Sequence, residues 1–244
     1  MKLDILAFGV HPDDIELSCA GVLLVEKNNG KKTGIIDLTQ GELGTRGTAA
    51  IRKEEAAASA RILQVDVREN LEMADGFFQN DRENQLKIIS VLRKYQPDIV
   101  LCNAPADRHP DHGRSAQLVR DAAFLSGLRK IETVCDNKVQ EVWRPAQLFN
   151  YIQDYYLAPD FVVDISHVIE QKIDAIRAFK SQFFSSEYNS DEPQTYISSP
   201  QFLESVIARN ASWGKMIGVQ HAEGFISDKT IGIRSFDGLV NNKT

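Results

Sequence analysis

The sequence is poor in the features that mark secreted and membrane-spanning proteins. It has only three cysteines, Cys19, Cys102 and Cys135, and no two of them form a CxxC pair. An odd and widely spaced set predicts free thiols in a reducing compartment, and the apolar runs around Cys19 and Cys102 favour buried thiols over metal ligands. No apolar run reaches the roughly 18 residues of a membrane-spanning helix, and no targeting segment is visible. We therefore expect a cytoplasmic protein.

An excess of positive charge is also missing. Lys and Arg number 28 against 34 Asp and Glu, which gives a formal net charge of −6. Nucleic acids and anionic membranes select basic surfaces, so neither is an expected partner, whereas a small-molecule substrate is. The composition, 43% hydrophobic and 25% charged, is ordinary for a globular protein. The length fits a single α/β domain that covers residues 1–244.

The first half of the chain alternates between strand patterns and helix patterns. Strands are predicted over 3–10, 33–39, 65–71 and 98–103, and helices over 16–29, 48–63, 81–95 and 113–126. Repeated strand–helix units predict a mainly parallel sheet with helices on both faces, and right-handed crossovers make it a doubly wound, Rossmann-like sheet. From about residue 146 the pattern is less regular. Strands are predicted over 146–152 and 161–163 and helices over 165–184 and 200–213, with a polar loop over 185–199.

Two histidine-containing segments follow two of the predicted strands. HPDDIE covers residues 11–16 after the first strand, and HPDHG covers residues 109–113 after the fourth. In open α/β sheets, ligands bind beyond the carboxyl ends of the strands, at the point where the strand order reverses. The first and fourth strands flank that point in the usual order, so the two segments are expected to meet. Either segment alone could be a turn or a helix cap, but three of the five histidines lie in them.

The residue types in these segments suit a metal ion. Two neutral imidazoles and one carboxylate are a typical catalytic zinc set that leaves a position for water. His11, Asp14 and His112 are the candidate ligands. Zn²⁺ is the expected ion, although Fe²⁺ or another divalent metal suits the same ligands. Three ligands disfavour a non-catalytic structural site, which normally has four.

The other polar residues of the two segments are candidates for proton transfer. Asp13 cannot point in the same direction as Asp14, so it can act as a general base toward a water molecule that the metal acidifies. His109 is expected one helical turn from His112, where it could protonate a leaving amine or stabilise an oxyanion. Asp111 could hold the His109 ring in orientation, as carboxylates around metal sites do.

At these residues the sequence resembles the LmbE-like, or PIG-L, family of deacetylases. The family motifs, His-Pro-Asp-Asp after the first strand and a His-Pro-Asp-His type motif further on, stand here at 11–14 and 109–112. The resemblance implies zinc-dependent hydrolysis of an N-acetyl amide, with the ligands and the general base named above. It also implies that His109 is the charged group near the oxyanion.

The resemblance extends beyond the two motifs, to the loop 41–48 with Arg52 and Glu55 after it, and to residues 222–225. This wider match is similar to the branch of the family that makes bacillithiol and deacetylates N-acetylglucosaminyl malate. His221 departs from it, because an aromatic residue is expected before 222–225. The resemblance further implies a homo-oligomer, often a hexamer.

Several alternatives stay open at this point. The same chemistry could act on an inositol-linked or lipid-linked N-acetylglucosamine, on a chitooligosaccharide, or on a mycothiol-type conjugate amide. A nucleotide-binding module is disfavoured because the chain lacks the glycine fingerprint.

Three residues are candidates for substrate binding. A malate conjugate carries two carboxylates, and arginine forks bind carboxylates better than lysine does. Arg52 and Arg108 are therefore candidates, each weighed against an ordinary structural salt bridge. Tyr196, in the polar loop, is the candidate to close over the acetyl group.

Overall fold

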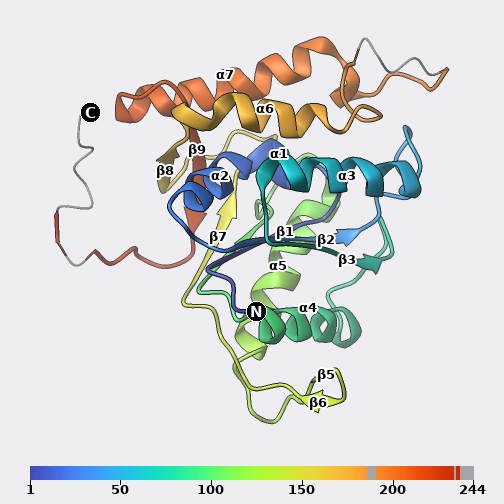
Figure 1. The fold of residues 1–244 in the computed structure, drawn as a ribbon, viewed down its shortest axis with the longest axis vertical. Helices are drawn as coiled ribbons and strands as arrows, with labels where there is room; N and C mark the ends of the chain where they lie inside the picture. Colours follow the sequence, from blue (N-terminus) through green and yellow to red (C-terminus); the bar gives the residue numbers. More distant parts are fainter. Residues whose placement is uncertain (186–190, 234, 237–244) are drawn as a thin grey trace.

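A seven-stranded sheet crosses the molecule, with helices on both of its faces (Figure 1). The structure is a computed structural model that describes residues 1–185, 191–233 and 235–236. The strands of the sheet are β1 (Ile5–Gly9), β2 (Thr33–Thr39), β3 (Val67–Met73), β4 (Ile99–Cys102), β7 (Gln147–Tyr151), β8 (Phe161–Asp164) and β9 (Ala222–Ser227). The helices are α1 (Asp14–Ser18), α2 (Ala20–Asn28), α3 (Ala49–Leu63), α4 (Arg82–Tyr95), α5 (Pro110–Leu125), α6 (Ile169–Arg177) and α7 (Pro200–Ile217). The 3₁₀ turns are η1 (Ser166–Val168) and η2 (Tyr196–Ser198).

The sheet has the strand order β3-β2-β1-β4-β7-β9-β8. β1 pairs in parallel with β2 on one side and with β4 on the other, so the order reverses between β1 and β4. The predicted doubly wound, mainly parallel sheet is confirmed. β9 is antiparallel to both of its neighbours, β7 and β8.

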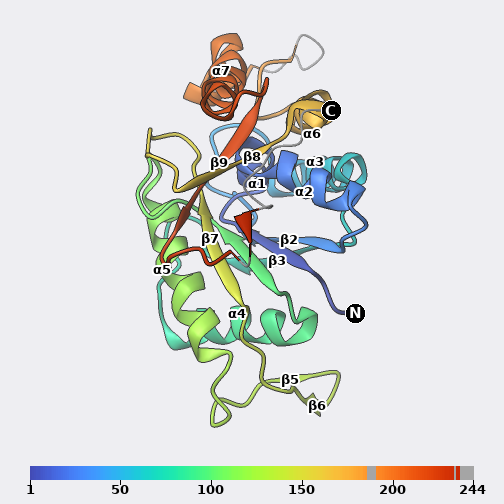
Figure 2. The same cartoon turned by 90° about the vertical axis from the view of Figure 1, so that its left-hand side faces the viewer.

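The helices form unequal layers on the two faces of the sheet. α4 and α5 cover one face, while α1, α2 and α3 cover the other, with α6 and α7 outside them (Figure 1). A short hairpin of β5 (Val134–Cys135) and β6 (Lys138–Val139) projects beyond α4 (Figure 2). Every residue of β1 and β2 is buried, as expected for strands covered on both faces. No helix in the described ranges is long and apolar enough to cross a membrane.

The structure corrects several predicted element boundaries. The single helix predicted over 16–29 is two helices, because the backbone of Cys19 leaves the helical conformation, with φ −136°. The helix predicted over 113–126 begins at Pro110, where the fixed φ of proline suits a first helical position. The helix predicted over 165–184 is replaced by η1 and the shorter α6. Residues 186–190 of the predicted polar loop lie outside the described ranges.

Candidate metal centre

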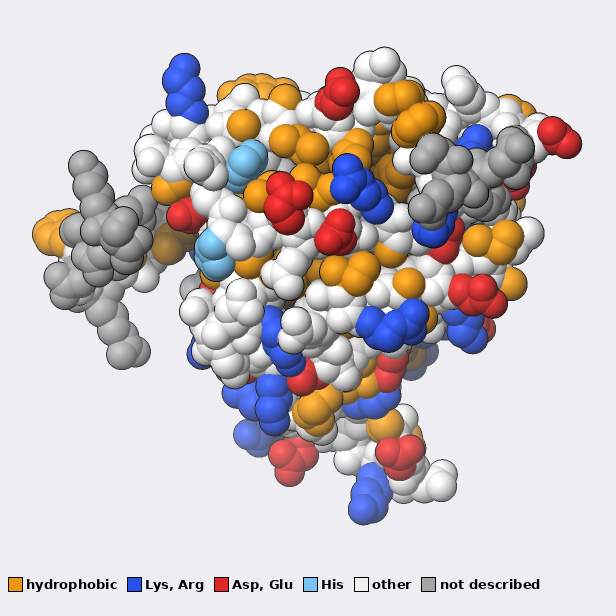
Figure 3. All heavy atoms as spheres, turned by 45° about the horizontal axis from the view of Figure 1, so that its top comes forward, with side chains coloured by type: hydrophobic (Ala, Val, Ile, Leu, Met, Phe, Trp, Pro, Cys, Tyr) orange, Lys and Arg blue, Asp and Glu red, His pale blue; other side chains and the backbone are white. Residues whose placement is uncertain are grey.

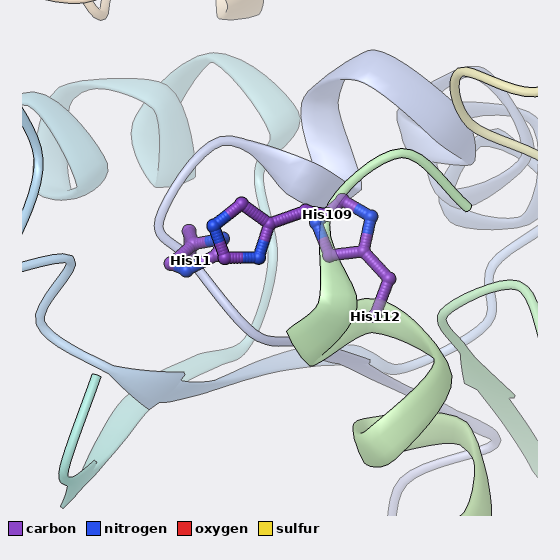
Figure 4. A group of neighbouring side chains, drawn as sticks. All are labelled: His11, His109 and His112. Atoms are coloured by element: carbon purple, nitrogen blue, oxygen red, sulfur yellow. The ribbon is translucent and has the colours of Figure 1, made fainter. Parts of the chain in front are cut away.

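The two histidine segments meet at the carboxyl ends of β1 and β4, as the sheet topology predicts. His11 lies in the turn after β1, His109 immediately precedes α5, and His112 lies in the first turn of α5 (Figure 4). One ring nitrogen of each lies within 4.8 Å of those of the other two. The ring centroids are 4.7 to 5.8 Å apart. Three imidazoles therefore face a common volume.

Asp14 is held rigidly beside two of these rings. Its Oδ2 atom accepts hydrogen bonds from the backbone amides of Val10 and His11 and from Asn103 Nδ2, at 2.9 to 3.1 Å. Its Oδ1 atom accepts from Gln153 Nε2 at 2.8 Å and lies 3.3 Å from His112 Nε2. Burial opposes ionisation, but the histidines and these donors hold the pKa of Asp14 well below its usual value. Asp14 is thus a fixed, ionised carboxylate.

Two further aspartates orient the rings of His11 and His112. Asp75 Oδ1 lies 2.9 Å from His11 Nε2, and Asp107 Oδ2 lies 2.7 Å from His112 Nδ1. In the neutral ring the proton lies on the nitrogen that faces the carboxylate, so the second nitrogen presents its lone pair to a cation. These nitrogens, His11 Nδ1 and His112 Nε2, are 3.9 Å and 3.3 Å from Asp14 oxygens. Two lone pairs and one carboxylate therefore lie on the same side, which fits a divalent cation.

The charges of the site also fit a cation. Burial disfavours charge on His112, yet Asp14 and Asp107 outweigh it and raise the pKa of His112 to about 10. Burial likewise opposes ionisation of Asp75, but the hydrogen bond with His11 lowers the pKa of Asp75 to about 2. The raised pKa of His112 means that the site stabilises a positive charge at that ring, and the lowered pKa of Asp75 means that this carboxylate stays ionised beside His11.

A second group with metal-binding side chains shares His11. Oxygens of Asp75 and Asp111 come within 4.8 Å of a His11 nitrogen. Asp75 Oδ2 accepts from the Leu43 amide, and the Asp111 oxygens accept from the Gly76 amide and from Arg114, so these atoms already have partners. The Asp14 oxygens have partners as well, but the position beside Asp14 has ring nitrogens of two histidines next to it and this one has a single histidine, so the position beside Asp14 fits a metal better.

The Asp111 carboxylate does not have the contact expected from the sequence. It accepts hydrogen bonds from Gly76 N at 2.8 Å and from Arg114 Nη1 at 2.7 Å, instead of holding the His109 ring. The reason is the early start of α5, which places Asp111 in the first helical turn and turns its side chain toward the loop after β3. The Asp111 contribution to His109 comes from its backbone amide.

His109 is the N-cap of α5, and its tautomer follows from that position. His109 Nδ1 accepts from the backbone amide of Asp111 at 3.3 Å, so the proton of a neutral ring lies on Nε2. Burial lowers the pKa of His109, and the nearby His11 and His112 lower it further. This shift opposes the charged form that the family resemblance implies. A neutral Nε2–H remains a hydrogen-bond donor.

Asp13 is separated from Asp14 by an unusual backbone conformation. Its φ is 143°, a value that costs a non-glycine residue about 1–3 kcal/mol. Its Oδ2 atom pairs with Arg52 Nη2 at 2.9 Å. Burial raises the pKa of Asp13 to about 7, although Arg52 opposes the shift. A carboxylate of this kind can exchange a proton near neutral pH.

The hydrogen bonds of Arg52 all go to other groups of the protein. Besides Asp13, its guanidinium donates to the carbonyls of Pro12 and Gly41. A Cβ atom on Gly41 would lie 2.0 Å from Arg52 Nη1, so the glycine-rich loop has to lack a side chain there. Arg52 is only 4% exposed. Its contacts favour a role as partner of Asp13 over the predicted direct contact with substrate.

Arg108 and Tyr196 form a separate cluster around Asp154. Arg108 Nε lies 3.2 Å from Asp154 Oδ2, and the guanidinium is 4.7 Å from the centroid of the Tyr196 ring. The Tyr196 hydroxyl donates to Asp154 Oδ1 at 3.1 Å. Both Arg108 and Tyr196 stay open to solvent.

The metal-binding side chains and the Arg108–Tyr196 cluster line one cavity of about 320 Å³. It is lined by every candidate site residue except Asp111, namely His11, Asp13, Asp14, Arg52, Arg108, His109, His112 and Tyr196. Sequence reasoning missed Asp75, Asp107 and Gln153. Asp107 could have been noticed as a carboxylate two residues before His109, whereas no motif marks Asp75 or Gln153.

Known proteins resemble this chain in sequence and in structure. Residues 6–123 match the PIG-L family model, described as GlcNAc-PI de-N-acetylase. Diacetylchitobiose deacetylase of Thermococcus kodakarensis is 30% identical over 236 residues, which cover 90% of this chain and 81% of that protein. A conserved protein of Thermus thermophilus, 38% identical, superimposes with a TM-score of 0.84 and covers 95% of this chain and 97% of its own. N,N'-diacetylchitobiose deacetylase of Pyrococcus horikoshii, 26% identical, gives a TM-score of 0.75 over 97% and 88% of the two chains.

Proposed function

Because the chain belongs to the PIG-L, or LmbE-like, family of deacetylases, we propose that it removes the N-acetyl group from a small N-acetylglucosaminyl conjugate with the help of a divalent metal. The chain is by this membership a hydrolase of amide bonds. The observation that carries the proposal is the convergence of His11, Asp14 and His112 on one side of a cavity, with a second buried carboxylate, Asp13, in the same cavity.

The proposed ion is Zn²⁺, held by His11, Asp14 and His112, and the same ligands suit Fe²⁺. When bound, the ion would polarise the acetyl carbonyl and make water in the cavity more acidic. Asp75 and Asp107 keep the ligand rings in orientation and leave their lone-pair nitrogens available.

The residues of the chain supply the proton transfers. Asp13 takes a proton from the attacking water, whose oxygen bonds to the acetyl carbon. His109 keeps its proton and donates a hydrogen bond from Nε2–H to the carbonyl oxygen, on which negative charge develops. The carbon–nitrogen bond then breaks, and the proton held by Asp13 passes to the sugar nitrogen. The products are acetic acid and the sugar amine, which at neutral pH become acetate and an ammonium group.

The finer proposal for the substrate is N-acetylglucosaminyl malate. Arg108 at the cavity supports it, because its guanidinium pairs with Asp154 through Nε but stays partly exposed and can donate to a carboxylate from its other nitrogens. A second candidate is diacetylchitobiose, which the Thermococcus relative favours at 30% identity.

A panel of substrates tests both the deacetylase activity and the choice of substrate. Purified protein loaded with Zn²⁺ is incubated with N-acetylglucosaminyl malate, diacetylchitobiose and an inositol-linked N-acetylglucosamine, and free amine is measured. We expect amine release, fastest from the malate conjugate. A higher kcat/KM for diacetylchitobiose would select the second candidate, and no release from any acetamido sugar would contradict the deacetylase proposal.

A further inference from the structure

We propose that Arg209 of α7 binds a carboxylate on the aglycone of the substrate and thereby determines specificity. The inference rests on the proposed deacetylase function and narrows the substrate to N-acetylglucosaminyl conjugates whose aglycone is an acid. Arg209 lines the same cavity as His112 and Tyr196, yet it belongs to no motif of the sequence.

The guanidinium of Arg209 lacks an acidic partner. Its Nη2 atom donates to the backbone carbonyl of Leu17 at 3.0 Å, and its carbon lies 5.6 Å from the centroid of the Trp213 ring. Its Nε atom is buried and has no hydrogen-bond partner. Within residues 1–185, 191–233 and 235–236, no aspartate or glutamate oxygen comes within the 4.0 Å of an ion pair with Arg209.

Two other arginines that line the cavity form ion pairs. Arg52 pairs with Asp13, and Arg108 pairs with Asp154. Lys172 is the buried cation most similar to Arg209 in its surroundings, because the Lys172 Nζ atom donates to the same Leu17 carbonyl. Lys172 forms an ion pair with Glu223 at 2.6 Å, whereas in the described part of the chain Arg209 has carboxylates such as Asp154 nearby but forms no ion pair with any of them.

A bound carboxylate would supply the missing charge. A cation that is largely withdrawn from water is unfavourable without an opposite charge, and burial lowers the pKa of Arg209 accordingly. The planar guanidinium can donate two parallel hydrogen bonds to a carboxylate. The surrounding wall of α7 is apolar, with Phe202 and Val206, so Arg209 is the polar anchor that α7 contributes to the cavity.

The position of Arg209 suits the part of the substrate remote from the reacting amide. The histidines enter the cavity from the ends of β1 and β4, whereas α7 lies in the outer layer beyond α1 and α3 (Figure 1). A conjugate with its acetamido group at His112 would therefore have another part available to Arg209. A neutral disaccharide offers no anion there.

The test compares N-acetylglucosaminyl malate with its dimethyl ester, which has the same skeleton without the two charges. The wild-type protein should show a higher kcat/KM for the acid. The Arg209→Gln variant should lower the acid-to-ester ratio about ten- to hundredfold, mainly through KM for the acid, because a hydrogen bond to a charged group is lost. Arg177→Gln, on the exposed surface of α6, is the matched control and should keep the wild-type ratio.

Binding to metal-free protein separates this inference from the proposed function. Isothermal titration with N-acetylglucosaminyl malate should show affinity that Arg209→Gln weakens about ten- to hundredfold and Arg177→Gln does not. If the wild type binds the acid through Arg209 but releases no amine when loaded with Zn²⁺, the deacetylase proposal fails and the inference stands. An unchanged acid-to-ester ratio in Arg209→Gln would overturn the inference. Should that variant not fold, Arg209→Met replaces it, because methionine keeps the length of the side chain without its charge, and an unchanged ratio there would overturn the inference equally.

Discussion

At the scale of single residues, the site works by giving neighbouring aspartates opposite environments. Asp14 accepts several hydrogen bonds and stays ionised, while Asp13, one residue earlier, is buried against a single arginine and has a pKa near 7. The strained φ of Asp13 separates the two side chains. One carboxylate can therefore hold a cation while the other exchanges a proton.

Replacing Asp13 by Asn tests this division. Asp13→Asn keeps the shape of the side chain but removes the base, so kcat should fall about 100- to 10,000-fold. Zinc content by elemental analysis should stay at the wild-type level, because Asp13 is not among the proposed ligands. Near-normal turnover would remove Asp13 from the role of general base.

Asp107 offers a test of the orientation of the ligands. Asp107→Asn weakens the hydrogen bond that fixes the His112 ring, and we expect zinc affinity to fall about 10- to 100-fold. Competition with a chromogenic chelator measures this affinity. Asp121→Asn, on the exposed part of α5, serves as control. Equal affinities of Asp107→Asn and the wild type would show that Asp107 does not support the ligand.

The sequence predicts the residues of the two motifs but not all of their partners. His11, Asp14 and His112 follow strands whose ends meet, so their proximity could be inferred from strand order alone. Asp75 and Gln153 reach the site from other loops, and their contacts depend on packing that no local pattern records. The Asp111 carboxylate contacts Gly76 and Arg114 instead of the His109 ring, because α5 starts three residues earlier than the sequence pattern predicts.

At the scale of secondary-structure elements, Glu223 ties three elements together. It lies in β9, accepts hydrogen bonds from the amides of Gly21 and Val22 at the start of α2, and pairs with Lys172 of α6. Both Glu223 and Lys172 are fully buried. This contact holds the start of α2 against β9 and α6 at the break after α1, the helix that begins with Asp14.

Removing the charge of Glu223 should destabilise the fold. Glu223→Gln leaves the Lys172 ammonium buried without an ion-pair partner, so we expect the free energy of unfolding to fall by about 3–5 kcal/mol. Urea denaturation followed by circular dichroism measures it. The double variant Glu223→Gln with Lys172→Met should recover part of the loss, because no unpaired charge remains. A change below about 0.5 kcal/mol in the single variant would contradict this account.

The elements that sequence patterns miss are those set by long-range contacts. β9 has the sequence AEGFIS, in which a glycine and an acidic residue obscure a strand, and only the pairing with β7 and β8 shows it. The helix predicted to reach residue 184 ends at Arg177. Beyond it, Ser181 donates from its amide and its hydroxyl to Glu55 of α3, which favours an irregular backbone.

At the scale of the whole molecule, the surface agrees with a small substrate. Acidic and basic side chains alternate with apolar and uncharged groups over the face in Figure 3. The net charge of −6 and the cavity that holds the site favour a small molecule over a nucleic acid. The homo-oligomer implied by the family resemblance stays a prediction, which sedimentation velocity can test.

The central claim is that a metal ion held at His11, Asp14 and His112 is needed for hydrolysis of the acetamide. The most direct measurement is acetate release from N-acetylglucosaminyl malate by protein that has been stripped with a chelator and then given one equivalent of Zn²⁺. The account predicts that stripped protein releases no acetate above background and that zinc restores turnover. Full turnover by the stripped protein would contradict it.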